Sequence, residues 1–218
     1  MTPDAMLFDL DGLLINTEVF SQRAFDETAN DYKLGDQTEF FLSLVGTNEE
    51  HHNNRVDEVF GSQIDAAAFR KDWNSRFHEF LATETIDVLP GVIDVLEYAQ
   101  QAGIKCAVAT SSTTDAGHKK IHDAGLRDYF LTITCGDQVA ISKPHPEIYQ
   151  KAGASVDADM SRSYGLEDSA NGVKSAHAAG LNVIQIPNLV PPSEELLQLG
   201  HQVYDSMFDV LKLLQSAR

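Results

Sequence analysis

Two aspartates near the N-terminus, Asp9 and Asp11, follow an apolar run and are followed at once by Gly12. In an extended strand the side chains alternate between two faces, so Asp9 and Asp11 point to the same side. Two like charges this close are costly unless a cation lies between them or one of them stays protonated. The spacing therefore indicates a site for a hard metal ion, a nucleophile with an acid/base partner, or both.

Three further groups of polar residues stand where predicted strands end or in the loops that follow. They are the hydroxyl run Thr110–Ser112, the ammonium of Lys143 in a Ser-Lys-Pro-His-Pro loop, and the acidic pair Glu167–Asp168. Each group alone is typical of a helix cap or a surface charge. Ligands of open α/β sheets bind beyond the carboxyl ends of the strands, so all four groups are expected at one edge. Together they suit a phosphate ester with a divalent cation.

The apolar pattern predicts that a parallel sheet wrapped by helices positions these groups. Strands are expected at residues 5–10, 104–109, 131–134, 163–166 and 183–186. Helices are expected at residues 92–102, before Gly125, after Pro146, before Gly180 and at residues 207–214, with a loop around residues 187–192. Repeated strand–helix units are typical of a parallel sheet covered by helices.

The segment from residue 17 to residue 86 has no convincing strand pattern and is predicted to be helical. Phe69, Trp73 and Phe77 recur every four residues, which is the spacing of one helix face. Such a stripe is expected to form a core and not a ligand site. The predicted fold is therefore α/β, with a three-layer Rossmann-like parallel sheet core (1–16 and 87–218) and an all-helical cap (17–86) inserted after the first strand.

Length and charge argue against several classes of protein. The 218 residues suffice for one large domain or a domain with a smaller insert. Sixteen basic against 33 acidic residues give a net charge of -17 with no basic cluster, which argues against nucleic acid or an anionic membrane as a partner. No apolar stretch is long enough to cross a bilayer, and the start lacks a basic signal region. With Cys106 and Cys135 expected as buried free thiols, we predict a cytoplasmic monomer.

The four polar segments together resemble the motifs of the haloacid dehalogenase-like hydrolase superfamily, in its phosphatase and sugar-phosphate mutase branch. That branch also inserts a helical cap after the first strand, and the resemblance spans nearly the whole chain. One small departure is Asn16, where a carboxylate often stands. The resemblance implies a Mg²⁺-dependent phosphatase whose partner is a small phosphate ester.

The resemblance also implies roles for individual residues. Asp9 would be the nucleophile, which takes the phosphoryl group as an aspartyl-phosphate. Asp11 would protonate the leaving oxygen and then activate the hydrolytic water, and its backbone carbonyl would contact the metal. The residues implied to bind phosphate are Thr110, Ser111, Ser112 and Lys143, and those implied to hold Mg²⁺ are Asp9, Asp11, Glu167 and Asp168.

Two alternative functions conflict with residues of these motifs. A dehalogenase of the same fold would lack the second aspartate, Asp11, and would need no metal. A catalytically quiet binding protein would be expected to lose Asp9, Asp11 or Lys143, and all three are present.

A third alternative, a sugar-phosphate mutase, depends on the cap. The mutases that resemble this chain carry an Arg three residues after a cap glycine, but here Glu49 follows Gly46 at that distance. An acid there should repel a bisphosphate intermediate, although Arg55 lies further along the same helix. The loop at residues 46–49 is our candidate for substrate selection, with Gly46 and Asn48 as contacts. Its polar side chains suit the hydroxyls of a sugar or polyol better than a nucleobase.

Overall fold

The computed structural model describes residues 2–45 and 49–216 and divides into two compact units. One unit combines Met1–Asn16 with Ile86–Arg218, and the other is Thr17–Thr85. The predicted cap contacts Gly46 and Asn48 lie outside the described residues. Among the residues that are described, no helix has both the length and the apolar character needed to cross a membrane.

Six parallel strands form one sheet within the described part of the first unit, in the order β3-β2-β1-β4-β5-β6. They are β1 (Ala5–Phe8), β2 (Lys105–Ala109), β3 (Thr132–Thr134), β4 (Tyr164–Glu167), β5 (Asn182–Gln185) and β6 (Gln202–Val203). Phe8, the last residue of β1, is in register with Val108 of β2 and with Leu166 of β4. The residues that follow β1 therefore leave the sheet between the ends of β2 and β4.

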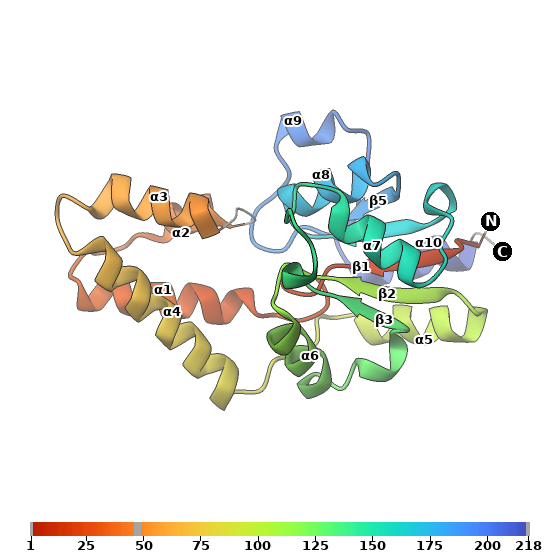
Figure 1. The fold of residues 1–218 in the computed structure, drawn as a ribbon, viewed down its shortest axis with the longest axis horizontal. Helices are drawn as coiled ribbons and strands as arrows, with labels where there is room; N and C mark the ends of the chain where they lie inside the picture. Colours follow the sequence, from red (N-terminus) through yellow and green to blue (C-terminus); the bar gives the residue numbers. More distant parts are fainter. Residues whose placement is uncertain (1, 46–48, 217–218) are drawn as a thin grey trace. The chain divides into compact units, whose positions relative to one another are not determined.

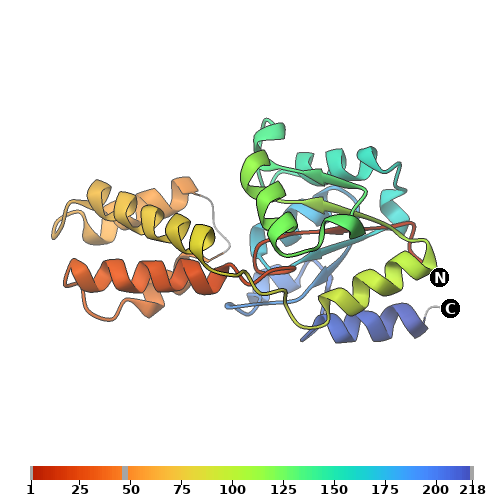
Figure 2. The same cartoon turned by 90° about the horizontal axis from the view of Figure 1, so that it is seen from below.

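Helices cover both faces of this sheet, which is why its central strand β1 is apolar and buried throughout. Figure 1 shows α7 (Glu147–Ser155) and α8 (Ala170–Ala178) over one face, where Leu7, Ala107, Ile148 and Val173 share a core. Figure 2 shows α5 (Val92–Ala102) and α10 (Met207–Ser216) side by side, with the sheet between them and α7. The predicted three-layer α/β class is confirmed.

The loop predicted around residues 187–192 is present, but two short elements that follow it are absent from the prediction. The chain forms α9 (Glu194–Leu197) and the short edge strand β6 before α10 begins. Both residues of β6 are exposed, so the strand has no apolar run that a sequence pattern can detect. The five predicted strands occur with boundaries shifted by one or two residues. Cys106 and Cys135 are buried free thiols, as predicted.

Helices are the regular elements of the second unit's described residues. They are α1 (Glu18–Asp31), α2 (Thr38–Leu44), α3 (Glu49–Phe60) and α4 (Ala66–Thr83), with α1 and α4 side by side. The ring of Phe25 contacts those of Phe41, Phe69 and Trp73 at centroid distances of 5.4, 5.8 and 5.1 Å. Phe69 is buried, which confirms the predicted core for that residue, whereas Trp73 and Phe77 are half-buried.

Candidate active site

Asp9 is a buried carboxylate directly beyond the central strand. Its backbone N–H donates to the carbonyl oxygen of Leu166 at 3.0 Å, which keeps it aligned with β4, and the residue is only 7% exposed. Lys143 Nζ donates to Asp9 Oδ1 at 2.5 Å. Burial raises the pKa of Asp9 from 3.8 to about 7; Lys143 opposes this rise, and the carboxylates of Glu167 and Asp11 add to it. Ionisation of the buried Asp9 carboxyl therefore costs free energy, and a further cation beside it would lower that cost.

Lys143 bridges two buried carboxylates. Its Nζ also donates to Glu167 Oε1 at 2.6 Å, and the hydroxyl of Tyr149 donates to the same oxygen at 2.6 Å. Burial by itself would lower the pKa of Lys143, but the charges of Asp9 and Glu167 outweigh it and hold the pKa above its usual range. The ammonium therefore stays charged, and a buried charge is stable when it is paired in this way.

The carboxylate of Glu167 lies against the first turn of α8. A Cβ at Gly172 would come within 1.9 Å of this carboxylate, so a glycine is required at that position. Ser169 caps the helix by accepting from the Gly172 N–H at 3.1 Å, and its hydroxyl donates to Glu167 Oε2 at 3.3 Å. The partial positive charge of a helix N-terminus further stabilises the anion here.

Three of the predicted metal ligands lie together. Asp9, Glu167 and Asp168 are all buried, and each offers a carboxylate oxygen within 4.8 Å of the other two. The backbone of Asp168 is held by Gln185, whose Nε2 donates to the Asp168 carbonyl at 3.0 Å. Hard oxygen donors at this spacing are what Mg²⁺ prefers. This donor set, with the raised pKa of Asp9, fits a divalent cation.

Two residues donate hydrogen bonds to the carboxylate of Asp11, one from a loop and one from the helix that follows this loop. Ser112 Oγ donates to Asp11 Oδ2 at 2.9 Å, and Lys120 Nζ donates to Asp11 Oδ1 at 2.6 Å. Lys120 belongs to α6 (Thr114–Asp123) and was not singled out in the sequence. The available signal was its position: Lys120 falls on the buried stripe of α6 together with Gly117 and Ile121, where a lysine is unusual.

The three hydroxyls predicted to bind phosphate differ in their surroundings. Thr110 is 1% exposed, and its Oγ1 accepts from the backbone N–H of Ser112 at 3.1 Å. Ser111 is exposed, whereas the Ser112 hydroxyl contacts Asp11. Of these three residues, Ser112 is therefore the one whose side chain contacts a carboxylate.

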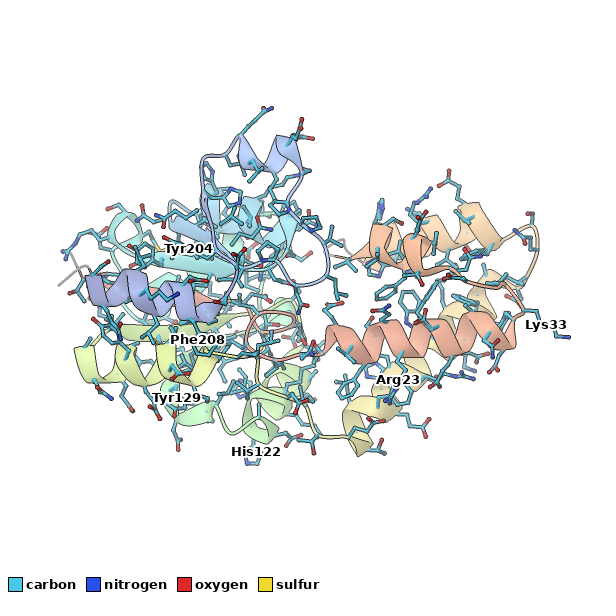
Figure 3. All side chains as sticks on the ribbon, turned by 180° about the vertical axis from the view of Figure 1, so that it is seen from behind. Arg23, Lys33, His122, Tyr129, Tyr204 and Phe208 are labelled. Carbon is cyan, nitrogen blue, oxygen red and sulfur yellow. The ribbon has the colours of Figure 1, made fainter. Side chains whose placement is uncertain are left out.

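Arg55 and His122 lie in ordinary surface settings. Arg55 of α3 donates to Glu58 Oε2 at 2.5 Å, an ion pair within its own helix. The side chain of His122 is 83% exposed and projects outward from α6, as Figure 3 shows.

Sequence comparison identifies the family to which this site belongs. A family model described as haloacid dehalogenase-like hydrolase matches residues 6–186, which include all four polar segments. The chain belongs to the haloacid dehalogenase-like hydrolase family. The resemblance inferred from the motifs is thus confirmed.

Other members of the haloacid dehalogenase-like hydrolases match the chain over most of its length. Protein CbbY of Cereibacter sphaeroides is 32% identical over 201 residues, which cover 88% of this chain and 87% of the relative. A phosphorylated carbohydrates phosphatase of Thermotoga maritima is 27% identical over 216 residues, or 97% and 98% of the two chains. A crystal structure of CbbY from Rhodobacter sphaeroides in complex with xylulose-(1,5)bisphosphate is 31% identical, with a TM-score of 0.72 and coverage of 94% and 95%. The prediction of a hydrolytic enzyme of the phosphatase type is confirmed.

Proposed function

We propose that the chain is a Mg²⁺-dependent phosphomonoester hydrolase that acts on a small sugar or polyol phosphate through an aspartyl-phosphate on Asp9. The observation that carries this proposal is the cluster at the end of β1. There, Asp9 lies 2.5 Å from the ammonium of Lys143, with Glu167 and Asp168 beside it. A nucleophile, a fixed cation and a cation-binding carboxylate set are the parts that phosphoryl transfer needs.

In the first half of the proposed reaction, a carboxylate oxygen of Asp9 attacks phosphorus and the ester P–O bond breaks. Asp11 donates its proton to the departing alkoxide, which leaves as an alcohol. Lys143 compensates negative charge around the transferring group. Thr110, with Ser111 close by, supplies a hydroxyl as a hydrogen-bond donor to the phosphoryl oxygens, while the Ser112 hydroxyl donates to Asp11.

In the second half, Asp11 acts as the base. It takes a proton from a water molecule as the water oxygen attacks phosphorus, and the P–O bond to Asp9 breaks. Inorganic phosphate forms and the Asp9 carboxylate is restored, so Asp11 ends the cycle protonated, as it began.

The residues that would hold Mg²⁺ are Asp9, Asp168, Glu167 and the backbone carbonyl of Asp11. Bound there, Mg²⁺ would neutralise charge on the phosphoryl oxygens and orient the phosphate. In a chain with a net charge of -17, a phosphate ester is otherwise repelled.

Two observations support a sugar or polyol as the organic part of the substrate. One relative is named for phosphorylated carbohydrates, and another has been crystallised with a sugar bisphosphate.

A panel of phosphate esters tests the proposed function directly. Phosphate release is measured with sugar phosphates, polyol phosphates, phosphoglycolate and nucleotides, first with Mg²⁺ and then with EDTA. We expect release that is concentrated on sugar or polyol phosphates and is abolished by EDTA. Release that survives EDTA would contradict the Mg²⁺ requirement. Interconversion of sugar phosphates without net phosphate release would favour a mutase instead.

Mg²⁺ binding to the free protein is expected to strengthen as the pH rises to about 7 and then to level off. The pKa of Asp9 is raised to about 7, so below that pH a proton competes with the cation for this carboxylate. The apparent Kd should rise about tenfold for each pH unit below 7. Titration calorimetry between about pH 5.5 and 8 measures this slope. The slope should disappear in Asp9→Asn, and a flat profile in the unmodified protein would remove Asp9 from the ligand set.

A further inference from the structure

Both carboxylate oxygens of Asp11 are occupied by partners from outside its own loop. Oδ2 accepts from the Ser112 hydroxyl at 2.9 Å, and Oδ1 accepts from Lys120 Nζ at 2.6 Å. Lys120 Nζ also donates to Ser112 Oγ at 3.1 Å, which closes a three-membered arrangement of hydrogen bonds. Two partners on two oxygens hold both the position and the rotation of a carboxylate, whereas one partner leaves the rotation free.

The packing of α6 explains how Lys120 reaches this position. Gly117, one turn before Lys120, lies so close to the strand ends that a Cβ there would be 3.1 Å from Cys135 Sγ and 3.3 Å from Thr110 Cγ2. Helical side chains lean toward the N-terminus of their helix, so the stem of Lys120 runs back toward Ser112. The Lys120 side chain is only 10% exposed, although Asp11 retains 26% exposure.

We propose that Lys120 is a positioning residue that holds the Asp11 carboxylate in place for its acid/base work. This inference rests on the proposed function, since it needs Asp11 in that role. Asp11 serves two successive proton transfers, and the efficiency of each depends on where its oxygens lie. The charged hydrogen bond from Lys120 fixes one of these oxygens and leaves the other to Ser112.

Kinetics with p-nitrophenyl phosphate separate this role from a structural one. Its leaving group is a weak base and departs without a proton, so formation of the phosphoenzyme does not need Asp11. Hydrolysis of the phosphoenzyme still does. Because kcat/KM reports the steps up to phosphoenzyme formation and kcat includes its hydrolysis, a misplaced Asp11 lowers kcat and KM together.

The test compares Lys120→Met with Lys119→Met on the same helix. Lys119 is 58% exposed and pairs with Asp123, away from Asp11. For Lys120→Met we expect kcat to fall about tenfold or more, with kcat/KM changed less than about threefold and phosphoenzyme accumulating in acid-quenched samples. Lys119→Met should match the unmodified enzyme. If Lys120→Met does not fold, Lys120→Gln is measured, and the same split is expected.

Asp11→Asn is the reference that separates this inference from the proposed function. If Asp11→Asn shows the split and the Lys120 variants do not, the Lys120 proposal is overturned and the role of Asp11 stands. A fall in kcat/KM equal to that in kcat would assign Lys120 to phosphate binding or to folding, which also overturns it. If Asp11→Asn itself shows no split, the acid/base role of Asp11 fails and the Lys120 proposal fails with it.

Discussion

Replacing Asp9 with Asn is expected to lower kcat by at least about 10⁴-fold, because the neutral amide cannot attack phosphorus. Asn has the same shape, and its side-chain oxygen can still accept from Lys143. The acyl-phosphate adduct that mass spectrometry should detect on the unmodified enzyme after acid quenching should be absent from the variant. Phosphate release is measured on the best substrate of the ester panel.

The same variant tests whether the loss is chemical or structural. Asp9 has a pKa of about 7 in the folded protein against 3.8 as its ordinary value. The folded state therefore binds this proton more tightly than the unfolded state does. As the pH rises from about 4 to 7, the Asp9 carboxyl progressively lowers the free energy of unfolding. Without Mg²⁺ at about pH 8, Asp9→Asn should thus be at least as stable as the unmodified protein.

Asp4→Asn is the matched control for this substitution. Asp4 stands before β1, at the end opposite to Asp9, where its carboxylate accepts from Lys105 Nζ at 3.3 Å. The activity of the Asp4→Asn variant should stay within about twofold of that of the unmodified enzyme, since Asp4 is remote from the cluster around Asp9. If Asp9→Asn kept even about a tenth of the activity, the covalent route would be ruled out. Removal of a nucleophile lowers the activity far more than tenfold.

Replacing Lys143 with Met is expected to be the second most damaging change, lowering kcat by about 10³-fold. The ammonium contacts Asp9 at 2.5 Å and Glu167 at 2.6 Å, so its loss leaves two buried carboxylates facing each other. Breaking a buried pair in this way costs about 3–5 kcal/mol of unfolding free energy. Urea unfolding without Mg²⁺ at about pH 8 should show this loss, and a smaller one at about pH 6, where Asp9 takes up a proton.

Mg²⁺ supplies the discriminating measurement for Lys143→Met. A divalent cation bound by the same carboxylates should restore part of the lost stability but little of the activity, because the ammonium also compensates charge on the transferring group. Lys151→Met on α7 is the control, since Lys151 is exposed and donates to the carbonyl of Gln138. Full activity in Lys143→Met would contradict the proposed role of this residue in catalysis.

The local pattern of the chain was enough to predict the fold class and the family. Apolar strands between amphipathic helices specify a covered parallel sheet, because both of its faces must be buried. The ends of parallel strands meet at one edge, so polar residues such as Asp9, Thr110 and Asp168 are expected near one another before their distances are known. The roles assigned to these residues stay predictions until the variants are measured.

Contacts between residues from distant parts of the chain were not predicted from the sequence. Tyr149 has the period of a core residue of α7, and only the packed structure brings its hydroxyl to Glu167. The short strand β6 has too few residues to form a pattern, and its pairing with β5 defines it.

Strand and helix periods are local properties of the chain, so sequence patterns alone predict which residue types stand at the ends of the strands. The contact between Lys120 and Asp11 joins residues 109 positions apart, so it depends on how the folded chain packs. Lys119 and Lys120 are adjacent residues of the same type in the sequence. The close approach of α6 to the strand ends at Gly117 turns one of them to the carboxylate and leaves the other in solvent.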